Sequence, residues 1–343
     1  MRAEDTLMFR EAADAGRVVA EQLRLNRPIA QALGQRLRDM SPTGVLICGR
    51  GSSDHAGVYG RYLIETGTGL LVSSAAPSIA SVYAVTPRLE GVVCIAISQS
   101  GQSPDLLASV TAAKQGGAFV IALVNVETSP LAQVADVVLP LRAGPEKSVA
   151  ATKSFIASLS ALAQLTGFWL RDDALLDALD ALPEQLDAAW SQDWSAVLPV
   201  LVDNENLYVV GRGPGFGIAC EAALKLKETA GLHAEAFSAA EVRHGPMALV
   251  KTGFPVLVLP QDDETRADTV ALAAEFATRG ARVMLAGGNG ASRVIGLPTI
   301  EAHAAIQPML MIESFYRLAA DVSIARGYDP DRPPYLNKVT ETV

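Results

Sequence analysis

A repeat inside the chain restricts its fold more than any other feature of the sequence. Gly49-Arg50-Gly51 recurs 162 residues later as Gly211-Arg212-Gly213, and each copy stands between an apolar run and a helical pattern. The same offset brings Ile97-Ser98-Gln99 onto Leu259-Pro260-Gln261, again at the end of an apolar run. An apolar run, a polar turn and a helix together form a βα unit. The repeat therefore predicts two duplicated α/β domains.

The apolar runs are nearly continuous, which is typical of parallel strands buried on both faces of a sheet. We expect each domain to be a doubly wound, flavodoxin-like parallel sheet flanked by helices. A helical preface interrupted at Pro28 precedes the first sheet, and an extended tail follows the second. The expected boundaries are 1–190 (preface, first domain and linker helices), 191–330 (second domain) and 331–343 (tail). The expected strands are 45–48, 70–73, 92–97, 119–123 and 137–139 in the first copy, with 207–210 and 256–259 in the second.

Composition excludes several classes of partner and cofactor. A net charge of -9 and a pI near 5.0 disfavour nucleic acid and anionic membranes as partners. The three cysteines are odd in number and show no CxxC spacing, so neither a disulfide framework nor a metal site is expected. The glycine turns lack the full GxGxxG spacing of dinucleotide sites, so no cofactor is expected. The start of the chain is not signal-like and no long apolar run follows, which predicts a cytoplasmic enzyme.

A polar loop follows the apolar run 92–97, at the point where the next helix begins. Its hydroxyls and amide belong to Ser98, Gln99, Ser100 and Ser103. Free backbone N-H groups and the helix dipole attract anions there, and these side chains add neutral donors, so the loop is a candidate phosphate site. The alternative is a helix N-cap followed by a polar turn. The second copy carries carboxylates in 260–264 that would repel a phosphate, so only the first copy is expected to bind one.

Charged residues gather in the second copy. Glu221, Lys225 and Glu228 have the spacing i, i+4 and i+7, which places them on one face of a predicted helix. If that face is exposed, the three residues are ordinary surface ion pairs. His244 follows soon afterwards and precedes Gly245-Pro246, which predicts a bend. Carboxylate, ammonium and imidazole together could transfer protons.

The order of these motifs resembles the pair of sugar isomerase (SIS) domains in the isomerase half of glutamine:fructose-6-phosphate aminotransferase. It is also similar to stand-alone glucosamine-6-phosphate deaminases built from the same pair. The resemblance covers nearly the whole chain. It rests on 51–53, 98–103, 149–153, 224–228, 233–236, 243–246 and the tail motif 336–340.

The resemblance implies roles for individual residues. The polar loop, with Ser53 beside it, would hold the phosphate of a 6-phosphosugar, and Ala150 and Ala151 would lie along the sugar. Glu228 would move a proton between C1 and C2, and His244 would assist ring opening. Lys225 would support the transferred charge, and Lys338 would lie over the substrate. A homodimer with a shared active site is also implied.

The chain departs from the family pattern at three places. Arg50 stands where the aminotransferase has a cysteine, Ala151 where it has a serine that touches the sugar, and Pro334-Tyr335 where the tail reads Arg-Asn. These differences bear on the choice of sugar.

The expected reaction is deamination and isomerisation of glucosamine 6-phosphate to fructose 6-phosphate and ammonia. No nucleophilic cysteine of a glutaminase domain follows Met1, so this chain is not expected to draw ammonia from glutamine. Three alternatives stay open: isomerisation of another phosphosugar, a synthase subunit fed with ammonia, and a sugar-phosphate sensor without chemistry.

Overall fold

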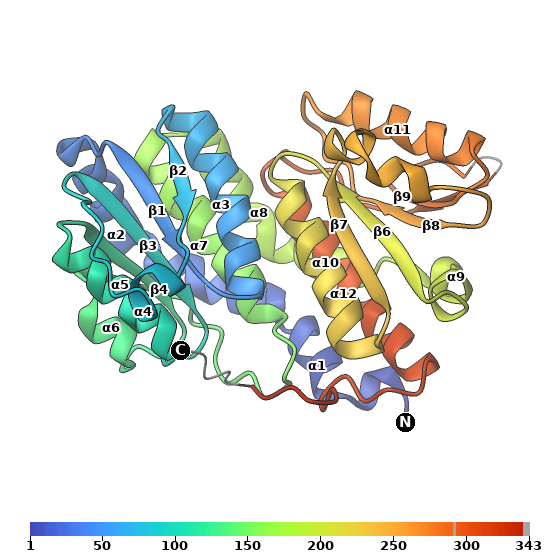
Figure 1. Ribbon diagram of the computed structural model, residues 1–343, viewed down its shortest axis with the longest axis horizontal. Helices are drawn as coiled ribbons and strands as arrows, with labels where there is room; N and C mark the ends of the chain where they lie inside the picture. Colours follow the sequence, from blue (N-terminus) through green and yellow to red (C-terminus); the bar gives the residue numbers. More distant parts are fainter. Residues whose placement is uncertain (291–292, 339–343) are drawn as a thin grey trace. The chain divides into compact units, whose positions relative to one another are not determined.

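The computed structural model describes residues 1–290 and 293–338, which fold around two separate parallel sheets (Figure 1). Contacts divide the chain into two units. The N-sheet unit contains residues 17–146, 153–181 and 337–338, and the C-sheet unit contains 1–16, 147–152 and 182–336 without the two undescribed positions. Both units are therefore built from separated segments, whereas the expected boundaries were continuous.

The two sheets have the same topology, which confirms the duplication. The first consists of β1 (Gly44–Cys48), β2 (Val72–Ser74), β3 (Val92–Ser98), β4 (Phe119–Val124) and β5 (Val137–Pro140), in the order β2-β1-β3-β4-β5. The second consists of β6 (Asn206–Gly211), β7 (His233–Ser238), β8 (Pro255–Val258), β9 (Arg282–Ala286) and β10 (Val294–Leu297), in the order β7-β6-β8-β9-β10. All pairs are parallel, and both orders are the flavodoxin-like order.

Helices cover both faces of the first sheet, as a doubly wound fold requires. On one face α5 (Pro104–Gln115) and α6 (Pro130–Val134) bury a core that includes Cys48 and Cys94. Ile47 points to the other face, as alternation along a strand dictates, and meets Gly57 of α3 (Ser52–Thr68). There α3 packs against α7 (Lys153–Leu170), while α4 (Ser78–Ser81) packs against α5.

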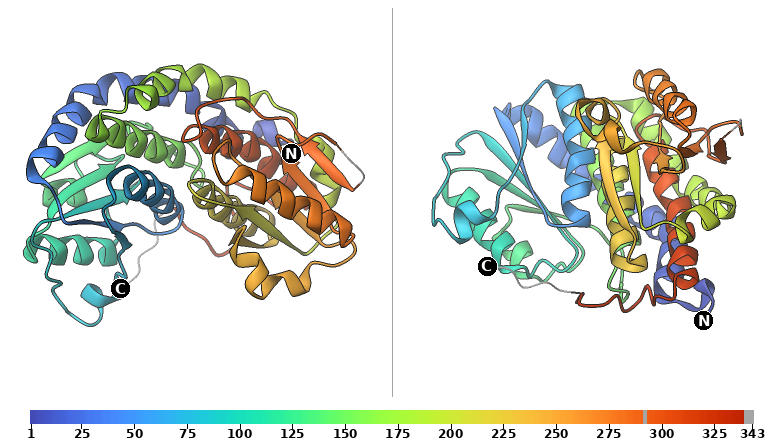
Figure 2. Two further views of the ribbon diagram at one scale, coloured as in Figure 1. Left: turned by 90° about the horizontal axis from the view of Figure 1, so that it is seen from above. Right: turned by 45° about the vertical axis from the view of Figure 1, so that its right-hand side comes forward.

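The second sheet is covered in the same way. On one face α11 (Arg266–Thr278) packs with the short helices η3 (Glu241–His244) and η4 (Pro246–Leu249) over a core that includes Tyr208, Val258 and Phe276. On the other face α10 (Gly215–Ala230) lies beside α12 (Gln307–Ala325), as both Figures 1 and 2 show. The N-terminal helix α1 (Leu7–Ala13) packs on α12. Further elements are η1 (Ala3–Asp5), η2 (Ser195–Val197), α9 (Leu198–Val202) and α8 (Asp173–Trp190).

The expected interruption at Pro28 is wrong, because Pro28 lies inside α2 (Ala15–Met40). A proline within a helix costs about 3 kcal/mol. Tertiary contacts next to it hold the helix: the Asn26 side-chain amide donates to the Pro140 carbonyl at 2.7 Å, and Arg27 pairs with Asp180 at 3.1 Å.

The sequence also did not predict three strands of the second sheet, the inner strand β9 and the two edge strands. Residues 233–238 read as part of a turn-rich segment, but they form β7 at one edge of the second sheet. Its first residues alternate between exposed and buried positions, and polar residues stand among them, so no continuous apolar run marks it. β10 at the opposite edge is short and contains Gly296.

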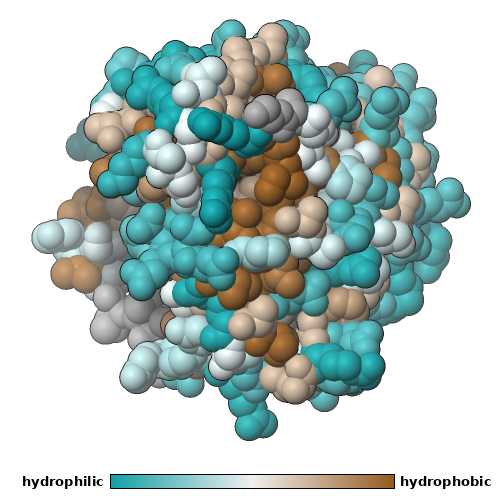
Figure 3. Space-filling model, turned by 90° about the vertical axis from the view of Figure 1, so that its right-hand side faces the viewer, coloured by the Kyte–Doolittle hydropathy of each residue, from teal (hydrophilic) through white to brown (hydrophobic). Residues whose placement is uncertain are grey.

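The described part of the tail is fixed at one point. Both oxygens of the Asp331 carboxylate accept hydrogen bonds from α1, from the N-H groups of Leu7 and Met8, each at 2.7 Å. Val339 and Thr340 of the tail motif lie outside the described residues. Within the described ranges, every helix is too short or too polar to cross a bilayer. One face of the molecule carries a strip of hydrophobic side chains within a largely hydrophilic surface (Figure 3).

Candidate functional site

The strand order of the first sheet reverses between β1 and β3, and the polar loop lies there. In open α/β sheets the carboxyl ends of strands on either side of such a reversal form the usual ligand site. β1 leads through Gly51, the N-cap of α3 with φ of +53°, into a first turn that contains the half-buried Ser53. β3 pairs directly with β1 and leads into the loop 98–103. The topology therefore brings Ser53 and the polar loop to the same edge of one sheet.

Two serines of the loop hold its turn. Ser98 Oγ accepts the Gly101 N-H at 2.9 Å, and Ser100 Oγ accepts the Gln102 N-H at 3.3 Å. Gly101 has φ of +66°, and a Cβ there would lie 2.3 Å from Ser129 Oγ, so this position requires glycine. Since both serine oxygens act as acceptors in these bonds, each hydroxyl can still donate its proton to an anion.

Ser103 lies at the start of the helix that follows the loop, where the sequence left a cap and a ligand donor as alternatives. It occupies the N-cap position of α5, with Pro104 at the first helical position, yet its side chain makes no capping hydrogen bond. The polar turn of the alternative interpretation is present, but its cap is not. The Ser103 hydroxyl is half-buried at the amino end of a helix of 12 residues.

An ion pair that the sequence did not predict connects the two loops. Arg50 donates to one oxygen of Asp105 from Nη2 at 2.6 Å and from Nε at 2.9 Å. The Asp105 side chain is 1% exposed, and its other oxygen accepts the Leu106 N-H at 2.8 Å. One guanidinium therefore lies beside the amino end of α5. The only feature of the sequence that pointed to this ion pair was the departure at Arg50 from the family pattern.

In the second sheet the corresponding position is the amino end of α10, and side chains of the protein occupy it. Gln261 is buried, and its Oε1 accepts the N-H of Gly215, the first residue of α10, at 2.7 Å. Its amide nitrogen donates to Asp263. A side-chain amide and a carboxylate thus occupy the helix terminus that would attract an anion, which agrees with the expectation that the two copies differ.

A buried group of charges lies on α10. Lys225 Nζ is 2.5 Å from Glu228 Oε2 and 3.5 Å from Glu221 Oε1. The side chains of Glu221, Lys225 and Glu228 are 0%, 1% and 23% exposed. They do share one helix face, as the spacing predicted, but the alternative of exposed surface ion pairs is wrong because that face is buried.

Tyr316 adds a fourth member that the sequence did not indicate. Its hydroxyl donates to Glu221 Oε1 at 3.2 Å from α12, 95 residues away in the chain. A buried ion pair is stable only when its remaining polar atoms also have hydrogen-bond partners. The Tyr316 hydroxyl provides such a partner for the Glu221 carboxylate. Glu228 is the member of this network with the most solvent access. A carboxylate held beside an ammonium, with access from outside, can accept and return a proton.

Three further predicted site residues, His244, Ala150 and Ala151, do not belong to the charged network on α10. His244 ends η3 in an exposed position before Gly245, whose φ is +137°. Among the described residues, no hydrogen bond or ion pair joins His244 to Lys225 or Glu228. Ala150 is buried and Ala151 half-buried, in the segment that precedes α7.

Lys338, the last described residue, is bound within the N-sheet unit. Its Nζ lies 3.0 Å from Oε2 of Glu146, whose side chain is 0% exposed. The same carboxylate accepts the Ser154 N-H at 3.1 Å and the Ser154 hydroxyl at 2.6 Å, so it also holds the amino end of α7. In residues 1–290 and 293–338 no group of three or more histidines, cysteines and acidic residues is arranged to hold a metal ion.

Comparison with known proteins finds similarity to SIS domains and to proteins that contain them. The profile of the SIS domain matches residues 42–166 and 200–308. Isomerising glutamine-fructose-6-phosphate aminotransferase of Aeropyrum pernix is 36% identical over 316 residues, which cover 86% of this chain and 50% of that protein. The chain spans about half the length of the curated relatives that it matches.

Two solved structures cover nearly all of this chain. A proposed phosphosugar isomerase from Silicibacter pomeroyi DSS-3 is 40% identical, with a TM-score of 0.90, over 95% of this chain and 100% of that chain. Glucosamine-6-phosphate deaminase from Thermotoga maritima is 22% identical, with a TM-score of 0.77, over 98% of this chain and 100% of that chain. The second likeness is one of fold alone.

Proposed function

The chain belongs to the SIS domain family, and on that premise we propose that it converts glucosamine 6-phosphate into fructose 6-phosphate and ammonia. The observation that carries the proposal is the network on α10, in which the partly exposed Glu228 is bonded to the buried Lys225. Conversion of an aldose to a ketose needs a base that removes a proton from one carbon and returns it to the next.

The proposed reaction begins with the opened sugar, whose C1 is an aldehyde and whose C2 carries the amine. Glu228 takes the proton from C2, and the electron pair moves toward the C1 oxygen. Lys225 stabilises the negative charge in this step. The proton then returns to C1, the C1 oxygen takes up one proton and the amine gives one up, which leaves a C1 hydroxyl and an imine at C2. Water adds to the imine and ammonia leaves, so that fructose 6-phosphate is the product. His244 is proposed to assist the ring opening.

The polar loop is proposed to hold the phosphate. Ser53, Gln99 and the three loop serines provide neutral donors, and two helices begin at this edge of the sheet. Binding energy from a phosphate that does not react can hold the reacting carbons in position.

Ser103→Ala tests the loop. We expect the Michaelis constant for the sugar phosphate to rise by about tenfold or more, because a hydrogen bond to a charged group is lost. The melting temperature should hardly change, since Ser103 makes no capping bond. Thr6→Ala is the matched control: Thr6 does cap α1 through the Phe9 N-H, so that variant should lose about 1 kcal/mol of stability and keep its Michaelis constant. A Ser103→Ala protein with an unchanged Michaelis constant would remove the serine from the phosphate site.

Lys338→Met tests the tail. We propose that this ammonium acts on the substrate, so turnover should fall by more than about tenfold. The free energy of unfolding should fall less than for a pair with both partners buried, because Lys338 is partly exposed and Glu146 keeps its bonds to Ser154. Glu146→Gln is the control, since it breaks the same ion pair and leaves the ammonium in place. Equal loss of turnover in both variants would mean that the pair is only structural.

A second candidate function is the sugar half-reaction of an aminotransferase. The identity of 36% to the Aeropyrum pernix protein favours it. The proton transfer would be the same, but the reaction would run from fructose 6-phosphate and ammonia toward the amino sugar.

The deciding experiment supplies glucosamine 6-phosphate to the purified protein without glutamine and measures both products. Equal yields of ammonia and fructose 6-phosphate support the deaminase. Amino sugar formed from fructose 6-phosphate and ammonium, without the forward reaction, supports the second candidate. If neither reaction occurs but calorimetry detects tight binding of the sugar, the protein is a sensor or acts on another phosphosugar.

A further inference from the structure

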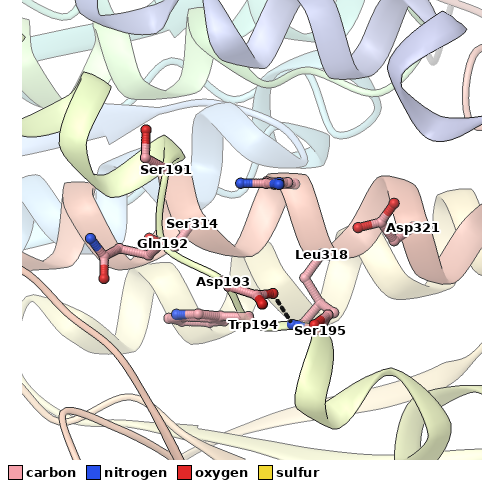
Figure 4. Close-up of a pocket in the computed structure, with 9 residues that line it drawn as sticks. Ser191, Gln192, Asp193, Trp194, Ser195, Ser314, Leu318 and Asp321 are labelled. Carbon is pink, nitrogen blue, oxygen red and sulfur yellow. Dashed lines mark hydrogen bonds between the residues drawn. The ribbon is translucent and has the colours of Figure 1, made fainter.

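A pocket of about 340 Å³ lies in the C-sheet unit, among residues that have no part in the proposed chemistry. One wall is the segment 191–195, which follows α8, and the other is α12 (Figure 4). Asp193 and Trp194 come from the first wall, and Leu318 and Asp321 from the second, together with Arg317. The volume falls in the usual range for small-molecule sites.

Opposite charges meet in this pocket without forming an ion pair. Arg317 Nη1 donates to the Trp190 carbonyl at 3.2 Å, and among the residues that the structure describes no carboxylate pairs with this guanidinium. Asp193 is held separately, because its Oδ1 accepts the Ser195 N-H at 2.8 Å. That bond lowers the pKa of Asp193, and Arg317 acts on it in the same direction. Partial burial raises the pKa of Asp321, while Arg317 opposes the rise.

The walls of the pocket are fixed by bonds that need no ligand. The Trp194 indole N-H donates to the Pro298 carbonyl at 2.8 Å, and the side chain is 2% exposed. Ser314 Oγ donates to the Ala189 carbonyl at 2.7 Å, which connects α12 to the end of α8. Leu318 is also 2% exposed and adds apolar surface. The pocket is therefore preformed, which lowers the entropic cost of binding.

The charges select the ligand. A simple anion would meet Arg317 but be repelled by two carboxylates, and a simple cation would be repelled by the guanidinium. A molecule with both charges satisfies both sides, and a planar carboxylate matches the fork of an arginine. We infer that this pocket binds a small zwitterion of the amino-acid type, with its carboxylate on Arg317 and its ammonium beside Asp193 and Asp321.

A larger groove in the same unit lacks this arrangement. Its volume is about 530 Å³, and its lining combines Val200, Val294 and Ile295 with Arg282 and Arg293. Both arginines are exposed, and within the described part of the chain no acidic residue lines the groove with them. The juxtaposition of a guanidinium with two carboxylates therefore distinguishes the pocket at Arg317.

The test is calorimetric titration of the full chain with L-serine and L-alanine, compared with acetate and ethylamine as the two halves of the zwitterion. At least one amino acid should bind at least about tenfold more tightly than either half, since it gains both charged contacts. Arg317→Met and Asp321→Asn should each weaken that binding by about tenfold or more. The turnover of glucosamine 6-phosphate should stay within about twofold in both variants, so the result does not depend on the proposed function.

Arg332→Met and Asp203→Asn are the matched controls, because both residues are exposed in the same unit. Neither control should change the binding of the amino acid. Absence of binding heat with both amino acids, or affinities equal to those of the half-ligands, would overturn the inference. The inference would also be overturned if Arg317→Met bound the amino acid as tightly as the wild type and had a normal melting temperature. Binding of glucosamine 6-phosphate alone, abolished by Arg317→Met, would assign the pocket to an amino sugar and also overturn it.

Discussion

Glu228→Gln is expected to lower turnover by about 10²- to 10⁴-fold, the usual contribution of a positioned proton-transfer group. Glutamine has the same shape as glutamate but cannot take up the C2 proton. Release of ammonia from glucosamine 6-phosphate should fall, and so should exchange of the C2 hydrogen with deuterated water. The two losses should be equal, because both depend on the same transfer.

The fold should survive this substitution. Lys225 keeps Glu221 as a partner at 3.5 Å, so its ammonium is not left without a carboxylate. Glu184→Gln on α8 is a suitable control, since that carboxylate is exposed and its loss should leave turnover unchanged. A Glu228→Gln protein with full turnover would exclude Glu228 as the base.

Lys225→Met is expected to lower the free energy of unfolding by about 3 to 5 kcal/mol, as for other buried ion pairs that lose one partner. The lysine side chain is 1% exposed and lies between two carboxylates, one of them 0% exposed. Without the ammonium, Glu221 and Glu228 would repel each other in a buried environment. Urea unfolding followed by circular dichroism measures the loss.

Lys227→Met is the matched control, because Lys227 stands two positions away on the same helix but is exposed. Its free energy of unfolding should stay within about 0.5 kcal/mol of the wild type. Adding Glu221→Gln to Lys225→Met should recover part of the stability, since it removes one uncompensated charge. Lys225→Met with wild-type stability would mean that the network is not held together by its charges.

The sequence alone determined the features that depend on local spacing. The offset of 162 residues predicted the duplication, and continuous apolar runs predicted the inner strands of the first sheet together with β6 and β8 of the second. The spacing of Glu221, Lys225 and Glu228 predicted one helix face, because the period of an α-helix is fixed by its backbone. Polar residues between a strand and a helix predicted the loop 98–103.

Only the tertiary structure decided which of these features are buried and what they contact. Nothing in the spacing on α10 indicates that its charged face lies under α12, or that Tyr316 reaches Glu221. The filling of the second helix terminus by Gln261 and the pairing of Lys338 with Glu146 were equally outside the reach of the sequence. Such contacts join residues far apart in the chain, and they depend on how whole elements pack. Local patterns specify the elements, whereas the free energy of burial is a property of the assembled fold.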